Sequence, residues 1–288
     1  VLMYIILGCD EIGNALARNL SKAGEETLII DNSETVFVGL KEPNLRTIIT
    51  NIHTLDFSSL PIKDTIAFIL LQKTSQDNLM IANRIKKLFP DKFVLSRATD
   101  EIEAAELLEN GVDRTVQIAR IVTHAILDEL ETAKLKTSVF HLVSVIQEAA
   151  GKGVAIFLQD NPDPDAIASG CALKRIAEKY HIKSTIYYGG NIGRQQNKIL
   201  VDLLETDLIQ LKTADEALEI AHAADKVALI EASIPSKNNI LPLQITPHIV
   251  IDHHETDFGL VKGEFIEILP KIGATSTILT RYLRHLDI

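Results

Sequence analysis

The stretch VAIFLQDNPDPDAIAS (residues 154–169) decides the fold of the second half of the chain. Its first five residues are all apolar, which is typical of a strand that is buried on both faces of a sheet. Asp163 and Asp165 follow this strand and lead into a helix. A buried strand followed closely by a helix is typical of a βαβ unit, in which neighbouring strands run parallel. The stretch therefore predicts an α/β domain.

The same alternation of strands and helices extends in both directions from this stretch. Towards the C-terminus we expect strands at 183–188, 227–230 and 248–251 and helices near 166–180, 195–204, 214–222 and 275–286. Towards the N-terminus we expect strands at 3–7, 27–30, 66–71 and 93–96, helices at 12–22 and 76–87, and then two helical patterns at 114–131 and 135–150. The fold class is therefore α/β: an N-terminal Rossmann-like doubly wound parallel sheet (1–131), a helical connector (132–150) and a second α/β domain with a mostly parallel sheet (151–288).

Length and composition restrict the class of protein. The 288 residues suffice for two compact domains, and 46% hydrophobic with 24% charged residues is ordinary globular composition. The net charge of −10 argues against binding to long nucleic acids. The apolar runs are far shorter than the roughly 20 residues that cross a bilayer, so we expect no direct membrane insertion. Cys9 and Cys171 lack disulfide or metal-knuckle spacing, which favours a reducing, cytoplasmic location.

A glycine loop follows the first expected strand. Gly8 and Gly13 frame the sequence GCDEIG (residues 8–13), and Asp31 ends the next strand. In dinucleotide-binding loops the glycines permit a tight turn and close helix packing, the helix N-terminus faces a pyrophosphate, and an acid at the position of Asp31 accepts from a ribose hydroxyl. Asp10 stands in place of the middle glycine, and its carboxylate would repel a pyrophosphate. A doubly wound domain that has lost or altered this ligand is the alternative.

The first half of the chain resembles the RCK (TrkA-N) nucleotide-binding domain over about residues 3–131. Besides the glycine loop, the resemblance lies in Asn51, Asp56, TSQDN (74–78), SRA (96–98), LL (107–108) and GVD (111–113). It implies a regulatory domain that binds NAD or an adenine nucleotide through Gly8, Asp10, Gly13 and Asp31, that forms a homodimer, and that has a potassium channel or transporter as its partner. Apolar positions on more than one side of 116–130 also favour a dimer.

Acidic and histidine side chains follow three expected strands of the second half. Asp163 and Asp165 follow 154–158, Glu231 follows 227–230, and DHH (252–254) follows 248–251. Because the carboxyl ends of parallel strands lie at one edge of a sheet, we expect these side chains to converge on one crevice. Hard oxygen ligands at such a place suit Mn²⁺ or Mg²⁺. An isolated Asp-Pro-Asp would instead favour an Asx turn with a helix cap, but this one is not isolated.

The second half resembles the DHH phosphoesterase family over about residues 135–288. Asp252, His253 and His254 match the motif that names the family, and its first motif is matched by Pro162, Asp163, Asp165, Ala166 and Ser169. The resemblance implies cleavage of phosphoester or phosphoanhydride bonds with two metal ions, Mn²⁺ or Mg²⁺, and an activated water. The implied substrate is small and phosphorylated: a short oligonucleotide, a nucleotide or a polyphosphate.

The same resemblance implies roles for individual residues. It assigns catalysis to Asp163, Asp165, Asp252, His253 and His254, and metal binding to Gln159, Asp163, Asp165, Glu231 and His253. It assigns substrate binding to Arg194, Asn197, Gly273, Thr275 and Ser276, in two segments that precede or open helices. Arg194 also lies in a glycine-containing loop, where a guanidinium can make a bidentate contact with a phosphate.

The chain departs from the DHH pattern at three points. Gln159 stands where many members have a metal-ligating histidine, and Glu231 stands where the second motif has aspartate. The last metal-binding aspartate and a C-terminal substrate-binding domain would lie beyond Ile288, so we expect residues 1–288 to be nearly inactive alone. The alternative function is a non-catalytic nucleotide-sensing regulator of potassium transport. Gln159 and Glu231 favour it, whereas the intact DHH motif opposes it.

Overall fold

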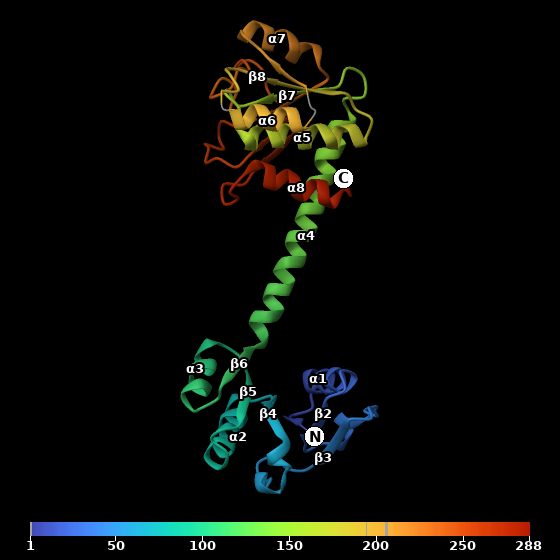
Figure 1. The fold of residues 1–288 in the computed structure, drawn as a ribbon, viewed down its shortest axis with the longest axis vertical. Coiled ribbons are helices and arrows are strands. Elements are labelled where there is room, and N and C mark those ends of the chain that lie inside the picture. The colour runs from blue at the N-terminus through green and yellow to red at the C-terminus, as the bar shows by residue number, and fades with distance from the viewer. Residues whose placement is uncertain (1, 194, 205–206) are drawn as a thin grey trace. The chain divides into compact units, whose positions relative to one another are not determined.

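The structure is a computed structural model that describes residues 2–193, 195–204 and 207–288. The chain divides into two compact units, Val1–Asp128 and Glu129–Ile288 (Figure 1). Each unit contains a six-stranded sheet in which all neighbouring strands pair in parallel. The predicted α/β class is confirmed, and the second sheet is wholly rather than mostly parallel.

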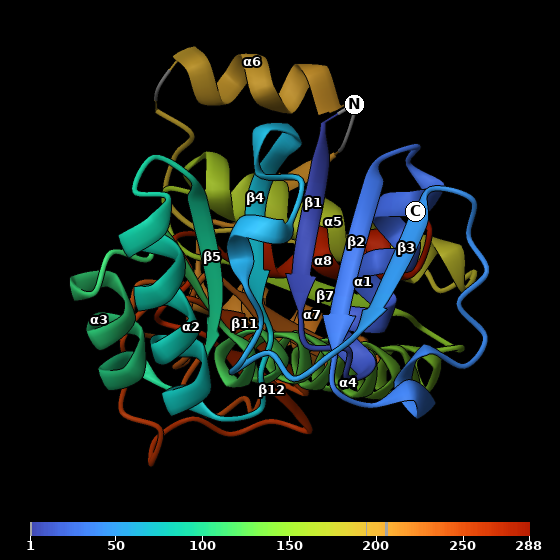
Figure 2. The same cartoon turned by 90° about the horizontal axis from the view of Figure 1, so that it is seen from below.

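The first sheet has the strand order β3-β2-β1-β4-β5-β6. Figure 2 shows its first five strands side by side, with β1 between β2 and β4. The direction of winding reverses between β1 and β4, and in sheets of this type ligands bind at the carboxyl ends of the strands beside that reversal. The strands are β1 (Met3–Leu7), β2 (Glu26–Asp31), β3 (Leu45–Ile49), β4 (Thr65–Leu70), β5 (Phe93–Ala98) and β6 (Arg114–Gln117).

Helices cover both faces of the first sheet. Helix α1 (Glu11–Lys22) packs on the face that carries Ile6 and Ile29. Helices α2 (Ser75–Leu88) and α3 (Glu101–Glu109) pack on the opposite face, which carries Ile5. Adjacent strand residues point to opposite faces, so a central strand buried on both sides must be apolar throughout, as β1 is. Short 3-10 helices lie at Glu34–Phe37, Phe57–Ser59 and Ile62–Asp64.

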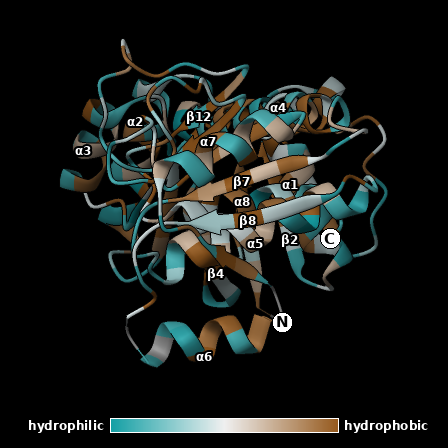
Figure 3. Ribbon diagram, turned by 90° about the horizontal axis from the view of Figure 1, so that it is seen from above, coloured by the Kyte–Doolittle hydropathy of each residue, from teal (hydrophilic) through white to brown (hydrophobic). Residues whose placement is uncertain are grey.

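The second sheet has the strand order β12-β11-β10-β7-β8-β9. Counted from β7, this order has the same connectivity as the first sheet, and its winding reverses between β7 and β10. Figure 3 shows β7 in a more hydrophobic colour than its neighbour β8. The strands are β7 (Val154–Leu158), β8 (Ser184–Tyr188), β9 (Leu208–Gln210), β10 (Lys226–Ile230), β11 (Ile249–Asp252) and β12 (Phe265–Ile268).

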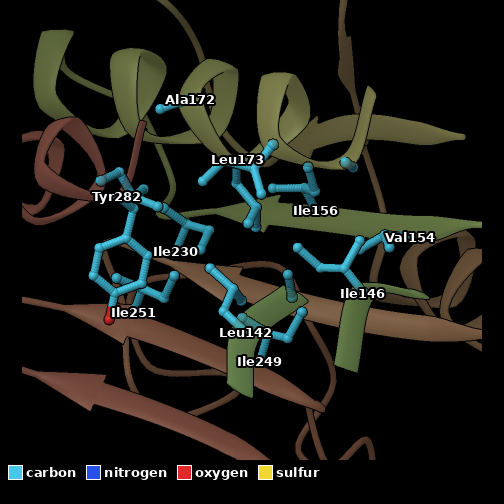
Figure 4. Packing of buried hydrophobic residues seen from close by; sticks show 14 of the residues in the cluster. Leu142, Ile146, Val154, Ile156, Ala172, Leu173, Ile230, Ile249, Ile251 and Tyr282 are labelled. Atoms are coloured by element: carbon cyan, nitrogen blue, oxygen red, sulfur yellow. The ribbon is translucent and has the colours of Figure 1, made fainter. Parts of the chain in front are cut away.

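The two larger hydrophobic clusters of the second unit lie on opposite faces of its sheet. Helix α5 (Pro164–Lys179), helix α8 (Thr275–His285) and the end of α4 pack on one face of the sheet. Figure 4 shows Leu142 and Ile146 of α4 against Ile249 of β11 in this core. Helix α7 (Ala214–Ala223) packs on the other face, which carries Phe157 and Leu229. Helix α6 (Gln195–Leu204) lies between β8 and β9 in the chain.

The long helix α4 corrects one prediction. We expected helical patterns at 114–131 and 135–150, but residues 114–117 form strand β6, and α4 (Ile118–Gln147) is one continuous helix of 30 residues. The physical reason is that 118–147 contain no glycine or proline that would end a helix. None of the described helices combines the length and the apolar character needed to span a membrane.

Candidate functional site

The predicted acidic and histidine residues gather where the second sheet reverses its winding. Strands β7 and β10 are neighbours, with Ile230 beside Leu158, so the segments after both strands leave the same edge. Strand β11 pairs with the other side of β10 and ends at Asp252. Polar side chains that follow these three strands therefore share one crevice, which is the usual ligand position in such folds.

Asp163 starts helix α5. Its backbone is extended, and its Oδ1 accepts a hydrogen bond of 3.0 Å from the backbone N–H of Ala166. Pro164 follows as the first helical residue, where its fixed φ suits a helix and its missing N–H removes no hydrogen bond. The Asx-type cap that we weighed as an alternative is therefore present. It places Asp163 at the crevice, and only one of its two carboxylate oxygens serves the cap.

Asp165 joins α5 to the start of α8. Its Oδ2 accepts from the backbone N–H of Thr275 at 2.9 Å, and its Oδ1 accepts from that of Ser276 at 2.8 Å. Burial alone would raise the pKa of Asp165, but the hydrogen bonds from Ser276 and Thr275 outweigh it and hold that pKa below its ordinary value. Asp165 is thereby held in one orientation as a carboxylate, 3.7 Å from Nε2 of His253.

The two histidines of the DHH motif have well-defined outer partners. Nδ1 of His253 lies 3.1 Å from the carbonyl oxygen of Ile272, which can only accept, so Nδ1 carries the hydrogen. Nδ1 of His254 lies 2.8 Å from Oδ1 of Asp252. Burial would lower the pKa of His254, but the hydrogen bond and charge of Asp252 outweigh it and raise that pKa. Carbonyl and carboxylate partners of this kind orient metal-ligating histidines.

Glu231 is the most deeply buried acid of the cluster. Its side chain is 2% exposed, and its Oε1 lies 3.1 Å from Nε2 of His253. Its φ is 61°, in the left-handed region that side chains other than glycine rarely adopt. Burial, with the charge of Asp165 adding to it, raises the pKa of Glu231 to about 7. Among the described residues Glu231 Oε2 has no hydrogen-bond partner, which is unusual for a buried carboxylate oxygen.

These residues fit a divalent cation. One ligand atom each of Glu231, His253 and His254 lies within 4.8 Å of the others, and Asp165 adds an oxygen next to His253. The unpartnered Oε2 of Glu231 and Nε2 of His253, the ring nitrogen that faces the acids, are atoms that could coordinate a cation. Mixed carboxylate and imidazole donors are compatible with manganese, which takes both ligand types.

Asp163 and Gln159 border this cluster more loosely. The charge of Asp163 contributes to the raised pKa of His254, which places that carboxylate nearby. Gln159 lines a pocket of about 140 Å³ together with Glu231 and His254, and its Oε1 accepts from Asn238 at 3.0 Å. Gln159 is thus at the site, with its carbonyl oxygen engaged by another side chain.

The predicted substrate-binding residues fall into two groups. The backbone N–H groups of Thr275 and Ser276 donate hydrogen bonds to Asp165, which places both residues at the site. Gly273 precedes them in an open part of the loop. Asn197 is buried, and its side-chain N–H donates to the carbonyl of Pro162 at 3.3 Å, beside the first motif. Arg194 lies outside the residues that the structure describes.

The structure adds two residues that the sequence analysis missed. Lys237 and Asn238 lie in the loop after β10 and line the pocket of about 140 Å³ beside the cluster. The signal available in the sequence was the polar run SKNN (236–239) after a buried strand that ends in an acid. Lys237 brings a positive charge to a site that is otherwise rich in carboxylates.

In the first unit, the glycines of the loop have clear structural roles. A Cβ atom at Gly13 would lie 2.2 Å from the carbonyl oxygen of Gly8, so only glycine fits this approach of helix to loop. Gly8 has a φ of 112°, which favours glycine for the turn itself. Both positions therefore match the turn and packing roles that the glycine pattern predicted.

Asp10 occupies the place that a phosphate would take in a dinucleotide fingerprint. Its Oδ1 accepts from the backbone N–H groups of Ile12 at 3.0 Å and Gly13 at 3.1 Å, and its Oδ2 lies 2.8 Å from Nη1 of Arg97. The carboxylate thus caps α1 and uses the amides that would bind an anion. Asp31 accepts from the N–H of Cys9 at 2.7 Å, which ties the loop to β2.

A wide pocket lies beside this loop in the first unit. Its volume is about 560 Å³, and Asp10, Asn14, Arg18 and Lys73 are among its lining residues. Two of these side chains are cationic, which suits a ligand with an anionic group. Burial, with the charges of Asp31 and Asp10 adding to it, raises the pKa of Cys9 to about 11, so this thiol in the pocket wall is protonated at neutral pH.

Comparison with known proteins bears on the first unit. Residues 4–118 match the family model of the TrkA-N domain. The N-terminal unit is therefore similar to a TrkA-N domain over these residues. Over the whole chain, the uncharacterized protein MJ1633 of Methanocaldococcus jannaschii is 30% identical over 303 residues, which cover 99% of this chain. This chain spans 60% of the length of that relative.

Solved structures with related folds are more distant. The NAD(P)-binding domain of an exopolyphosphatase-related protein from Archaeoglobus fulgidus is 23% identical, with 46% of this chain and 99% of that chain covered and a TM-score of 0.41. The TrkA-N domain of the inner membrane protein ybaL from Escherichia coli is 21% identical, covers 44% of this chain and 96% of that chain, and also has a TM-score of 0.41. The GsuK channel bound to NAD is 10% identical, with 99% and 64% covered and a TM-score of 0.37.

Proposed function

We propose that this chain couples a nucleotide-sensing TrkA-N domain to a divalent-metal site that hydrolyses a small phosphorylated substrate. The observation that carries the hydrolytic part is the convergence of Asp165, Glu231 and His253 at the winding reversal of the second sheet. These groups follow three different strands, and two of them are acids. Two carboxylates this close would repel each other, and a bound cation would offset that repulsion.

Different residues of the second unit would have different roles in such a site. Glu231, His253 and Asp165 would hold the cation, and Mn²⁺ or Mg²⁺ would supply an activated water and neutralise the phosphate charge. The Ile272 carbonyl and the Asp252 carboxylate would keep the two imidazole rings in place. Lys237 would face the phosphate from the pocket wall.

The dimensions and charge of the site support one class of substrate. Its pocket of about 140 Å³ has room for a phosphate group rather than for a large ring system. We therefore propose a substrate that presents a terminal or accessible phosphate: a short oligonucleotide, a nucleotide or a polyphosphate. In this proposal the TrkA-N domain binds NAD or an adenine nucleotide and controls the hydrolysis.

A second candidate is a non-catalytic nucleotide-sensing regulator of potassium transport. The TrkA-N match favours it, because that match covers residues 4–118 and none of the metal-site residues. Gln159 also favours it, since a side-chain amide that is engaged by Asn238 is a weaker ligand than an imidazole. In this candidate the second unit would bind a ligand without hydrolysing it, and the partner would be a transporter or channel.

Calorimetric titration with Mn²⁺ tests the metal site on residues 1–288. Wild type should bind Mn²⁺, and Asp165→Asn should weaken binding by at least about tenfold, because the loss of even an outer partner of a metal ligand typically costs about ten- to a hundredfold in affinity. The matched control is Asp215→Asn, which removes the same charge from an exposed position in the first turn of α7. Equal and negligible binding in wild type and Asp165→Asn would refute the metal site.

A hydrolysis screen separates the two candidates. The gene product that contains this chain is assayed for phosphate release from oligonucleotides, nucleotides and polyphosphate with Mn²⁺, with and without NAD and ATP. Release that requires Mn²⁺ and disappears in Asp165→Asn supports the enzyme. Mn²⁺ binding and nucleotide binding without release from any of these substrates would support the regulator instead.

A further inference from the structure

A second pocket lies in the C-terminal unit, beside helix α8. Its volume is about 520 Å³, which falls within the range of small-molecule sites. Its wall is formed by the part of α4 between Glu131 and Ser138, by the loop between β12 and α8, and by α8 itself. Apolar contacts come from Leu135, Leu269, Pro270, Ile272 and Ile278.

The floor of this pocket contains a polar group that lacks a partner. Tyr282 is 1% exposed, and among the described residues its hydroxyl has no hydrogen-bond partner. Beside it, the hydroxyl of Ser138 donates to Glu267 at 3.2 Å. Burial, with the charge of Glu267 adding to it, raises the pKa of Tyr282, so the hydroxyl stays protonated and can donate.

The charges around the pocket favour an anion. Lys134, Lys271 and Arg281 all line it. Arg281 lies 4.0 Å from Glu131, whereas neither lysine has an ion pair within the described part of the chain. Two lysines without acidic partners beside an apolar wall are complementary to a molecule that has both an apolar body and an acidic group.

We propose that this pocket binds a small organic anion with an apolar body and that its occupancy adjusts the geometry of the metal site. The effect on the metal site rests on the function proposed above. The link is short, because Ile272 lines the pocket and its carbonyl accepts the hydrogen of Nδ1 of His253 at 3.1 Å. Ile278 also lines it, one turn after the amides of Thr275 and Ser276 that hold Asp165.

This link runs through contiguous contacts. A ligand that displaces the loop between β12 and α8 must move the Ile272 carbonyl. This movement changes the hydrogen bond that holds Nδ1 of His253, whose Nε2 lies beside Glu231. Displacement of α8 along its axis moves both amides that position Asp165. Two candidate metal ligands are therefore held by a segment whose opposite side forms the pocket, so ligand affinity and metal affinity are coupled reciprocally.

Binding is tested on residues 1–288 with 8-anilinonaphthalene-1-sulfonate, an aromatic anion whose fluorescence rises in apolar sites. We expect a saturable site that Lys271→Glu weakens by about tenfold, since the reversed charge would face the sulfonate. The matched control Arg284→Glu reverses a charge at an exposed position of α8 outside the pocket and should leave the affinity unchanged. Equal affinities in Lys271→Glu and Arg284→Glu would overturn the proposed site.

Coupling is measured on metal-free protein, from the imidazole ¹H–¹⁵N signals of His253 by nuclear magnetic resonance. These signals are assigned with His253→Gln. We expect the sulfonate to shift them at similar concentrations in wild type and in Arg284→Glu, and to need about tenfold more sulfonate in Lys271→Glu. Unshifted signals at saturating sulfonate would overturn the coupling. A failure of the protein to bind Mn²⁺ would count against the proposed function and leave this measurement intact.

Discussion

Asp10 in the glycine loop of the first unit leads to a quantitative prediction about nucleotide binding. Its carboxylate uses the N–H groups of Ile12 and Gly13 and lies next to Arg97. A pyrophosphate at the N-terminus of α1 would have to displace this carboxylate or lie beside it. Replacing Asp10 by Asn keeps a side-chain oxygen as helix cap, because Asn and Asp are about equally good at that position. The substitution therefore removes the charge with little change in the cap.

The magnitude follows from Coulomb's law. A unit charge on Asp10 and one on a phosphate about 5 Å away repel by about 0.8 kcal/mol in a water-like dielectric and by about 3 kcal/mol at an effective dielectric of about 20. These energies correspond to factors of about 4 and about 200 in the dissociation constant. Asp10→Asn also frees Arg97 to pair with the phosphate, which acts in the same direction. We expect NAD and ADP to bind Asp10→Asn at least about fourfold more tightly than wild type.

Isothermal titration calorimetry at fixed ionic strength measures this effect, and thermal unfolding verifies that the variants remain folded. The matched control is Glu11→Gln, which removes a neighbouring exposed charge from the same pocket but is not the cap residue. Its affinity should change less than that of Asp10→Asn, because an exposed charge is screened by water and salt. Unchanged or weaker NAD binding by a folded Asp10→Asn would refute the idea that Asp10 occupies the phosphate position.

Three further predictions concern stability and assembly. Gly13→Ala should lower the free energy of unfolding by more than about 2 kcal/mol in denaturant titrations, because its Cβ would lie 2.2 Å from the Gly8 carbonyl oxygen. Hydrogen bonds from Lys86 and Val94 outweigh burial and hold the pKa of Asp113 below its ordinary value, so its contribution to stability is present above about pH 4 and is lost as the pH falls below it. Asp113→Asn should therefore lose less stability than wild type between pH 5 and 3 in acid unfolding. Light scattering should give twice the 31.8 kDa of one chain, and Leu127→Lys on α4 should reduce it to one.

Each of these predictions has a control in the same chain. Gly193→Ala should be tolerated, since among the described residues no heavy atom other than those of its own chain neighbourhood lies within 4 Å of the added Cβ. Asp91→Asn changes an exposed carboxylate near the same strand and should follow the acid unfolding curve of wild type. Leu108→Lys alters an exposed leucine of α3 and should leave the dimer intact, and a single-chain mass for wild type at micromolar concentration would contradict the dimer altogether.

Much of the fold was predictable because local patterns decide it. Strands buried on both faces have long apolar runs: β7 is apolar throughout, and β10 is apolar from Val227 to Ile230. The positions of β1, β2, β4, β5, α1 and α2 also agree with the periodicity of the sequence. The four strands that the sequence did not reveal, β3, β6, β9 and β12, are outer strands of three to five residues. At the edge of a sheet, burial on one or neither face leaves no distinctive hydrophobic run.

The kinds of side chain at the site could be predicted from the sequence, because an acid lies at or within a few residues of each strand end. These acids are Asp163 and Asp165 after β7, Glu231 after β10, and Asp252 at the end of β11. Their hydrogen-bond partners, in contrast, depend on the tertiary structure. Asp165 meets the amides of Thr275 and Ser276 across 110 and 111 residues, and Asp10 meets Arg97 across 87 residues. The reason is that hydrogen bonds of this kind depend on which strands become neighbours, and that order is set by packing of the whole sheet and not by any local pattern.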